Sequence, residues 1–449
     1  MTGEFIVAKL KNLESIDGAD KIQQAKIFGE TVIIPTTHKE GELGILFDCE
    51  TQLSEHFVHH NNLYRKGNMN YDKDKVGYIE ENRRIRPIKL RGVKCSGLWM
   101  PVESLKNIPE LHNFNVEDLK EGEQYKSVGG INISDKYVSP KTGRRIKSKE
   151  GRAKINLTPT FKEHVDTDQF MRNLNDLNKN LLVTITEKLH GTSGRVGYLP
   201  VIQKPNWFDV VISLFKKPTE KTSYGFVVGS RRVVKSVDGG EVENKEHFYN
   251  EDLWTKIGLE FFKNKLHKGE TVYFEIVGFT PDGGHIMPFV SNEKLKNFLD
   301  KKEYQAFLNR YGQTTEFTYG CTRDLDLKPT YMVYVYRITT TNEDGVSYDL
   351  SWDQIKIRSE ELGLNHVPEL DRRIINQSEI DDGSYVEFVE KIVTDESEQF
   401  PSHIREGVVV RIDTGKKTPI FLKHKSFIFK VLEGIIKEKD DVVDMEEAN

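Results

Sequence analysis

A lysine and a histidine lie two positions apart where an apolar run meets a glycine. The run 181–185 (LLVTI) is followed by Glu187, Lys188, His190 and Gly191. Successive side chains of a strand point to opposite faces, so Lys188 and His190 are predicted to share a polar face, while Glu187 on the apolar face needs a polar partner. Gly191 allows a sharp turn or a close backbone approach. Taken alone, the pattern is more typical of a surface lysine beside a packed histidine than of a nucleophile.

Two further lysines alternate along the strand-like run 419–427 (PIFLKHKSF), where Lys423 and Lys425 are predicted to share a face with Phe421. Like charges on one strand face repel unless an anion lies near them, so the run predicts a polyphosphate site, with a solvated edge strand as the alternative. A lysine has an ordinary pKa of about 10.4 and attacks only as the neutral amine. Cations near Lys188 would therefore favour a nucleophilic role by lowering its pKa.

Four short motifs lie between these two lysine segments. They are, in order, 229–232 (GSRR), 273–278 (YFEIVG), 333–338 (VYVYRI) and 406–411 (EGVVVR). Together with KLHG at 188–191, this ordered set resembles the covalent nucleotidyltransferase superfamily of ATP-dependent ligases and mRNA capping enzymes, whose nucleophile motif is Lys-x-(Asp/His)-Gly. Histidine at the third position resembles the nick-sealing RNA ligase branch, and the strand-rich N-terminus resembles those members that carry an N-terminal OB domain.

The resemblance implies an ATP-dependent RNA ligase that joins a 3′-hydroxyl to a 5′-phosphate through lysyl-AMP and RNA-adenylate intermediates, in RNA repair or nick sealing. Its implied ligands are RNA, ATP and Mg2+ or Mn2+. Lys188 would accept AMP, with His190, Lys423 and Lys425 as further catalytic residues. Among the implied ATP-binding residues, Glu187 and Tyr336 would lie at the base and Gly191 at the close approach. Glu275 would contact the ribose, and Arg231 the phosphate or ribose. Glu406 would hold the metal through water, with Glu275 as a second metal candidate.

Three features depart from the pattern of similar ligases. Ser193 stands where nick-sealing ligases often have asparagine, and Arg337 stands where an acidic residue commonly follows the aromatic. Tyr334 shares the predicted face of Tyr336 and is the alternative stacking residue. The segment 201–223 resembles an insertion; its apolar residues recur at helical spacing and predict a small helix that packs on the sheet, with a lid as the alternative.

The first 102 residues contain short strand-like runs separated by turn residues, at 5–13, 22–29, 31–37, 44–49, 85–92 and 97–102. This spacing predicts a small β-barrel, and 85–105 resembles the strand, glycine turn and strand of OB-type domains. We expect an α+β chain, with helices at 167–180, 252–266 and 352–364. The expected parts are an OB-like nucleic-acid-binding domain (1–111), a partly basic linker (112–167), an adenylyltransferase domain of antiparallel sheets with flanking helices (168–436) and a disordered acidic tail (437–449).

The 449 residues carry a net charge of −5, which argues against a protein coated in positive charge for bulk nucleic-acid binding. RNA contacts are instead expected from a basic run whose candidates are Arg83, Arg84, Arg86, Lys89, Arg91 and Lys94. No run approaches the roughly 20 apolar residues of a membrane span, and the three cysteines lie far apart. We expect a cytoplasmic monomer without membrane attachment, disulfides or a zinc cluster.

Other functions stay open. A DNA ligase and a GTP-using capping enzyme share the lysine chemistry, but His190 in place of aspartate and the N-terminal position of the OB-like domain count against both. A non-catalytic RNA-binding protein built on an OB domain is the remaining alternative. The presence of Glu275, Glu406 and both lysines of 419–427 counts against a decayed site.

Overall fold

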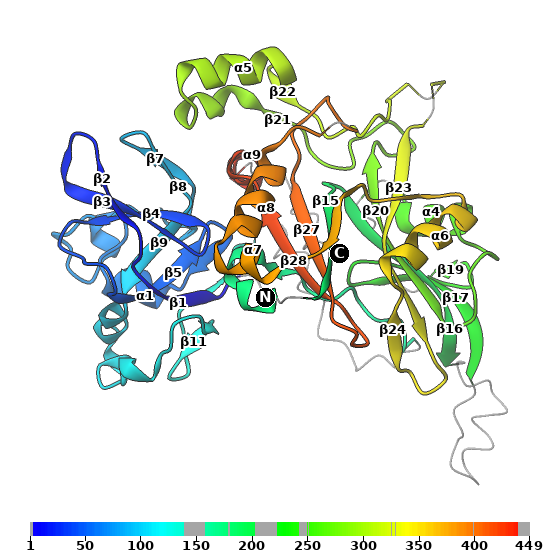
Figure 1. Cartoon of the computed structure of the whole chain (residues 1–449), viewed down its shortest axis with the longest axis horizontal. Helices are drawn as coiled ribbons and strands as arrows, with labels where there is room; N and C mark the ends of the chain where they lie inside the picture. Colours follow the sequence, from blue (N-terminus) through cyan, green and yellow to red (C-terminus); the bar gives the residue numbers. More distant parts are fainter. Residues whose placement is uncertain are drawn as a thin grey trace, which may run out of the picture.

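A computed structural model describes most of the chain as two groups of sheets that lie side by side (Figure 1). We call residues 3–138 the N-terminal region and residues 158–438 the C-terminal region. The described residues are 3–138, 158–177, 180–202, 222–241, 249, 251–324, 326–327, 329–397 and 399–438. The helix predicted in 201–223, the basic run 141–154 and nearly all of the acidic tail lie outside them. No helix of the described part is long and apolar enough to cross a membrane.

The N-terminal region is built on a sheet with the order β10-β1-β5-β9. Alternation along β1 divides its side chains between two cores: Phe5 and Val7 pack on one side, and Ile6 and Ala8 on the other. Its strands are β1 (Phe5–Lys9), β5 (Leu43–Asp48), β9 (Gly97–Pro101) and β10 (Gln124–Tyr125), with a second sheet of β2 (Leu13–Ile16), β3 (Ala19–Ile27) and β4 (Glu30–Pro35).

Each of the six predicted strand-like runs contains a strand, but the described strands form separate sheets and no closed barrel is found among them. The OB-type barrel is therefore not confirmed. Smaller elements complete the region: β6 (Thr51–Leu53) with β13 (Ser134–Lys136), the hairpin of β7 (Ile88–Leu90) and β8 (Val93–Cys95), the pair β11 (Ser127–Val128) and β12 (Ile131–Asn132), and helix α1 (Glu55–His60).

The C-terminal region contains two larger sheets, which confirm the predicted mixed α/β fold with mainly antiparallel strands. The first has the order β14-β28-β27-β15-β26, with β14 (Asp168–Gln169), β15 (Leu182–Lys188), β26 (Glu369–Ile374), β27 (Gly407–Asp413) and β28 (Ile420–Lys425). The second has the order β19-β18-β17-β16-β20-β23-β24, with β16 (Thr192–Ile202), β17 (Thr222–Ser230), β18 (Val234–Val237), β19 (Gly240–Glu241), β20 (Glu270–Gly278), β23 (Tyr331–Thr341) and β24 (Ser347–Asp349). Two short pairs complete the strands: β25 (Asn365–His366) beside β23, and β21 (Val290–Ser291) with β22 (Thr314–Thr315).

Helices flank these sheets. Two predicted helices are confirmed: α4 starts at the N-cap Asp252, and α6 starts at Ser351 with a capping box and ends at Gly363 in the left-handed conformation. The helices are α4 (Leu253–Phe261), α5 (Lys301–Tyr311), α6 (Trp352–Leu362), α7 (Gln377–Asp381), α8 (Ser384–Thr394) and α9 (Phe427–Glu438).

The α-helix predicted at 167–180 is wrong. The described part of this segment forms β14 and two single 3-10 turns at Phe170–Arg172 and Leu174–Asp176. Two effects favour this outcome over a helix. Asn and Asp side chains compete with the helical backbone for hydrogen bonds, and the Arg172 guanidinium is held by Asp48 of the N-terminal region at 2.9 Å.

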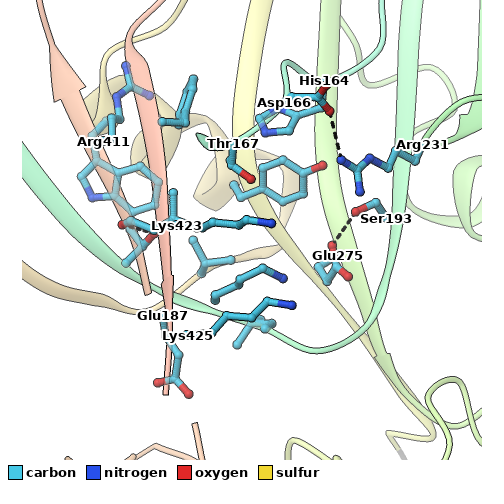
Figure 2. A pocket seen from close by; sticks show the side chains of 18 of the residues that line it. His164, Asp166, Thr167, Glu187, Ser193, Arg231, Glu275, Arg411, Lys423 and Lys425 are labelled. Carbon is cyan, nitrogen blue, oxygen red and sulfur yellow. Dashed lines mark hydrogen bonds and ion pairs between the residues drawn. The ribbon is translucent and has the colours of Figure 1, made fainter. Parts of the chain in front are cut away.

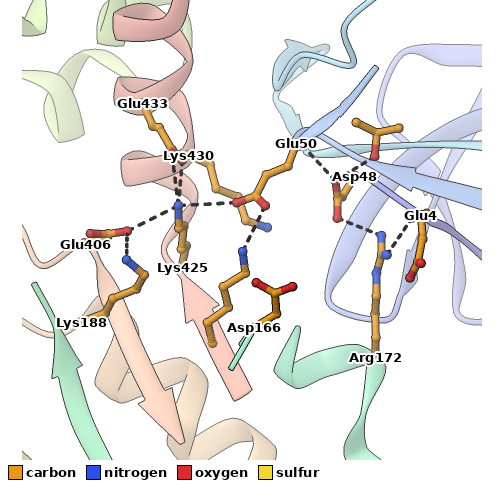
Figure 3. Close-up of polar contacts among 12 residues, drawn as sticks. Glu4, Asp48, Glu50, Asp166, Arg172, Lys188, Glu406, Lys425, Lys430 and Glu433 are labelled. Carbon is orange, nitrogen blue, oxygen red and sulfur yellow. Dashed lines mark hydrogen bonds and ion pairs between the residues drawn. The ribbon is translucent and has the colours of Figure 1, made fainter. Parts of the chain in front are cut away.

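The two regions meet through buried charges (Figure 3). Besides the pair between Arg172 and Asp48, Lys430 of α9 contacts Glu30 at 2.7 Å. The described parts of the predicted linker divide between the regions. Residues 112–138 contribute Val128 and Ile133 to the N-terminal core, and residues 158–167 lie in the C-terminal region with Phe161 in its core. We call residues 158–167 the strap.

Candidate active site

The chain passes from the first large sheet to the second at the KLHG stretch. Lys188 is the last residue of β15, and β16 begins at Thr192. A side chain at Gly191 would place its Cβ 2.3 Å from the carbonyl oxygen of Ile276 on β20. The predicted close approach is therefore confirmed, and its partner is the backbone of β20. Only glycine lets the turn after β15 come this near to β20, and Lys188 and Glu275 line the same pocket on either side of this turn in the chain.

A buried carboxylate joins the lysine and the histidine. Lys188 Nζ lies 2.7 Å and His190 Nδ1 lies 3.4 Å from the two oxygens of Glu406, which precedes β27. Both side chains thus contact one carboxylate, although β15 ends at Lys188 and the predicted strand face does not extend to His190. Burial alone would raise the pKa of the Glu406 carboxyl, but Lys188 and Lys425 outweigh burial and hold that pKa below its usual value. Glu406 is therefore a carboxylate at neutral pH.

The two lysines of β28 face a carboxylate of the N-terminal region (Figure 3), and the predicted polyphosphate at these lysines stays a prediction. Glu50 lies 3.2 Å from Lys423 Nζ and 3.5 Å from Lys425 Nζ. Lys425 also contacts Glu406 at 3.4 Å and Glu433 at 3.0 Å. Both lysines are buried, so these carboxylates compensate charges that would otherwise be costly to bury.

A pocket opens beside Lys188, and both regions line it, since Lys136 of the N-terminal region is among the lining residues. Figure 2 labels lining residues of the C-terminal region. Seven residues predicted from the sequence line it: Glu187, Lys188, Arg231, Glu275, Tyr336, Lys423 and Lys425. The lining residues that the prediction missed include Lys136, His164, Asp166, Thr167, Trp352 and Arg411. Phe421, which was predicted on the face of Lys423 and Lys425, and Ser193, whose role the sequence left open, also line it. Tyr334 packs against Phe400 with ring centroids 6.0 Å apart and is absent from the lining, so the geometry favours Tyr336 over Tyr334 as the aromatic wall.

His190 lies beneath the pocket and does not line it. Its ring packs edge-on against Phe317 and Phe429, with centroids 4.6 and 5.0 Å away, and its backbone N–H donates to the Tyr319 hydroxyl. Its contact with Glu406 is therefore the contribution of His190 to the site. A direct contact between the His190 side chain and a nucleotide does not fit this burial.

Glu187 has the polar partners that its place on the apolar face required. Ser397 Oγ donates to Glu187 Oε2 at 3.0 Å, and Arg405 Nε lies 3.4 Å from the same oxygen. Burial raises the pKa of Glu187 despite these partners. Glu187 is thus a lining residue whose carboxyl is buried against Ser397 and Arg405.

Glu275 and Ser193 face each other across the pocket wall. Ser193 Oγ donates to Glu275 Oε2 at 2.8 Å (Figure 2). The Ser193 carbonyl accepts from Trp254 Nε1 at 3.0 Å. Arg231, at the end of β17, contacts Asp166 of the strap at 3.4 Å.

The strap supplies a histidine that sequence analysis missed. The His164 ring lies 5.1 Å from the Tyr336 ring and 5.5 Å from the Phe421 ring, and Arg337 Nη1 donates to His164 Nδ1 at 3.3 Å. Burial and Arg337 together hold the pKa of His164 well below its usual value, so the ring is neutral at pH 7. Arg337 in turn is paired with Asp349, at 2.6 Å.

This arrangement accounts for Arg337, the residue that departs from the acidic pattern of similar ligases. Its ion pair with Asp349 replaces the local pairing that an acidic residue would make, and it also fixes the His164 ring. No periodicity or motif in the strap marks His164 from sequence alone. Its role depends on a tertiary contact with β23.

The basic run 83–94 does not form one exposed stripe. Arg84 is only 5% exposed, donates to the Gly434 carbonyl of α9 at 3.2 Å and lies over the Tyr137 ring. It serves the contact between the regions and is not accessible to RNA. Arg83 donates to the Leu53 carbonyl, and Lys94 contacts Glu303 of α5 at 3.3 Å. Arg91, at the tip of the β7–β8 hairpin, is exposed, and Arg86 and Lys89 are half-buried.

Comparison with known proteins identifies the fold and the family. No curated protein matches the chain by sequence. Similar solved structures include a mutant of Naegleria gruberi RNA ligase with ATP and Mn, at 16% identity and a TM-score of 0.54, with 97% of this chain and 99% of that chain covered. Naegleria gruberi RNA ligase with PPi is also similar, at 17% identity and a TM-score of 0.52, with 95% of this chain and 97% of that chain covered. The family described as RNA ligase matches residues 182–432, more than half of the sequence, and the chain belongs to this family.

Proposed function

We propose that the protein is an ATP-dependent RNA ligase that seals 3′-hydroxyl and 5′-phosphate ends, with Lys188 as the residue that carries AMP. One observation carries the proposal. The Lys188 amine, the carboxylate of Glu275 and the lysine pair Lys423 and Lys425 line a single pocket, and a buried carboxylate, Glu406, holds the amine from behind at 2.7 Å. The similar Naegleria gruberi structures contain ATP with Mn, or PPi, in the same fold.

In the proposed reaction, the neutral Lys188 amine attacks the α-phosphorus of ATP. A nitrogen–phosphorus bond forms and the nitrogen releases one proton to solvent, while the bond from the α-phosphorus to the bridging oxygen breaks and pyrophosphate leaves. A 5′-phosphate oxygen of RNA then takes the AMP from Lys188, and the 3′-hydroxyl displaces AMP to form the phosphodiester. Lys423 and Lys425 stabilise the charge on the phosphates, Glu275 accepts from the ribose, and Tyr336 lies against the base.

A divalent cation fits this donor set in one way. In the described part of the chain, no three His, Cys, Asp or Glu side chains converge closely enough to bind a metal directly. Mg2+ commonly keeps several waters and binds one or two carboxylates together with substrate phosphates. Glu406 is buried and does not line the pocket, so it would hold the ion only through water, and Glu275, which lines the pocket, is the second carboxylate. A bound ion would supply charge neutralisation at the phosphates.

RNA binding is proposed for the β7–β8 hairpin of the N-terminal region, where Arg91 is exposed and Lys89 and Lys94 are half-buried. The proposal keeps the division into a nucleic-acid-binding part and a catalytic domain. The first part extends to residue 138, because β10 pairs with β1, and the strap joins the catalytic domain, because His164 and Asp166 line the pocket.

Covalent labelling tests the proposal. Purified protein incubated with Mg2+ and α-labelled ATP should retain label after denaturation, and Lys188→Ala should retain none. The matched control is Lys256→Ala. Lys256 is exposed, and Glu251 is its one ion-pair partner among the described residues. The labelled enzyme should seal a nicked duplex with RNA ends faster than the DNA equivalent. Absence of label in the unmodified protein, or label with GTP in preference to ATP, would overturn the proposal.

A further inference from the structure

Ser193 occupies a defined place in the second large sheet. It is the second residue of β16 and pairs directly with Glu275 of β20 in the antiparallel register. Side chains of directly opposed residues lie on the same face of a sheet, and this is where the Ser193 hydroxyl donates to Glu275 Oε2 at 2.8 Å. The backbone of Ser193 is fixed as well, because its carbonyl accepts from Trp254 Nε1 at 3.0 Å.

A third side chain lines the pocket together with this pair. Tyr336 of β23 and Ser193 are both lining residues, and the Tyr336 ring lies 5.1 Å from the His164 ring. The phenol expected at the base therefore has a neighbour of its own in the strap. The Ser193 hydroxyl sets the direction of the carboxylate expected at the ribose.

We propose that Ser193 is a positioning residue that determines how strictly the nucleotide site requires sugar hydroxyls on ATP, because it fixes the direction of the Glu275 carboxylate. The inference rests on the proposed function and goes beyond it in assigning nucleotide-sugar selectivity to this position. A site built to hydrogen-bond a substrate hydroxyl rejects an analogue that lacks it, since a buried polar group is then left unpaired. A carboxylate that can rotate loses part of that discrimination.

The experiment compares single-turnover adenylylation of the full chain with ATP, 2′-dATP and 3′-dATP. For the deoxy analogue that the unmodified protein rejects most, the ratio of the ATP rate to the analogue rate should fall roughly tenfold in Ser193→Ala, the scale of one hydrogen bond to a charged group. Ser193→Thr keeps a hydroxyl and should restore the ratio. Ser359→Ala is the matched control, because Ser359 is a buried serine of α6 whose hydroxyl donates to the Ile355 carbonyl.

Two results overturn the inference. One is an equal loss with all three nucleotides in Ser193→Ala. The other is an unchanged ratio together with slower joining of pre-adenylated RNA, which would assign Ser193 to the RNA. If Ser193→Ala does not fold, Ser193→Cys keeps the volume with a weaker donor and should show the same fall in the ratio. Failure of the unmodified protein to take label from ATP would contradict the proposed function itself and is a separate outcome.

Discussion

Buried charges are arranged differently at two places in the molecule, the contact between the two regions and the pocket. At the contact, cations and carboxylates are matched one to one: Arg172 with Asp48, and Lys430 with Glu30. At the pocket, carboxylates are shared, since Glu406 contacts both Lys188 and Lys425, and Glu50 contacts both lysines of β28. In a matched pair, each charge is already compensated by one partner, so a further ion adds little stabilisation. A shared carboxylate leaves each cation able to exchange part of its contact for a phosphate.

The largest effect is expected from breaking a matched ion pair at the contact between the regions. Arg172→Met would leave the Asp48 carboxylate buried without its guanidinium, since their side chains are only 3% and 4% exposed. Removing one partner of a buried pair typically costs about 3–5 kcal/mol. We expect a loss of that size in the free energy of unfolding, measured by urea denaturation of the full chain.

Arg372→Met is the control for this prediction. Arg372 pairs with Asp353 at 2.6 Å, but the two side chains are 24% and 54% exposed, so the expected cost is below about 1 kcal/mol. Equal losses in the two variants would contradict the distinction between buried matched pairs and exposed ones.

The next largest effect is expected from removing the charge of a shared carboxylate at the pocket. Glu406→Gln keeps the shape of the side chain but removes the charge that Lys188, Lys425 and His190 share. We expect single-turnover adenylylation to slow by about 10²–10³-fold, the scale of losing one preorganised electrostatic group. Unfolding free energy, measured in parallel, separates this effect from a loss of the fold. An adenylylation rate within threefold of the unmodified protein would show that sharing the carboxylate has no part in the reaction.

A third prediction concerns a titratable group that is neither matched nor shared. His403 lies among the rings of Phe317, Tyr319 and Phe400, and burial lowers its pKa to about 4. The unfolded chain therefore binds a proton near pH 6.5 that the folded chain refuses, so stability falls as the pH drops from 6.5 towards 4. Between pH 6.5 and 5 the loss from this group is about 2 kcal/mol.

His403→Phe should remove that share of the pH dependence, measured as the difference in unfolding free energy between pH 6.5 and pH 5. The comparison with the unmodified protein is needed because His164, whose pKa is also lowered by burial, contributes in the same direction. An identical pH dependence in the two proteins would mean that His403 is protonated without cost.

The smallest predicted effect concerns Glu50, which belongs both to the contact between the regions and to the shared carboxylates of the pocket. Glu50→Gln removes a carboxylate that competes with phosphate for Lys423 and Lys425. We expect pyrophosphate to bind roughly tenfold more tightly, a change of about 1.4 kcal/mol, in calorimetric titration. Glu30→Gln, which removes a matched carboxylate of the same contact, should leave pyrophosphate affinity unchanged. Weaker binding in Glu50→Gln alone would indicate that this carboxylate takes part in binding.

Local patterns predicted much of the site. Alternation along β15 placed Lys188 and Glu187 on opposite faces, and alternation along β28 placed Lys423 and Lys425 together, because the period of a strand is a property of the backbone. The helices α4 and α6 were predicted for a similar reason, since apolar residues recur along them at helical spacing.

Features that depend on distant partners could not be predicted. Arg84 belongs to a basic run, yet its guanidinium is buried against α9, and the run itself contains no sign of that contact. Glu50 reaches the site because the two regions pack together, and His164 reaches it through contacts with β23, which is distant in sequence. The predicted barrel rested on strand spacing, which does not determine whether neighbouring sheets close on each other.

The strap sets a limit on how the molecule can be divided. A catalytic fragment that began at Asp168, where β14 starts, would lack the histidine and the aspartate that wall the pocket, whereas one that began at Thr158 would retain them. If the N-terminal region is exchanged for the corresponding part of another ligase, the junction should be placed before the strap. The strap then stays with the catalytic part of the chain, whose pocket it lines.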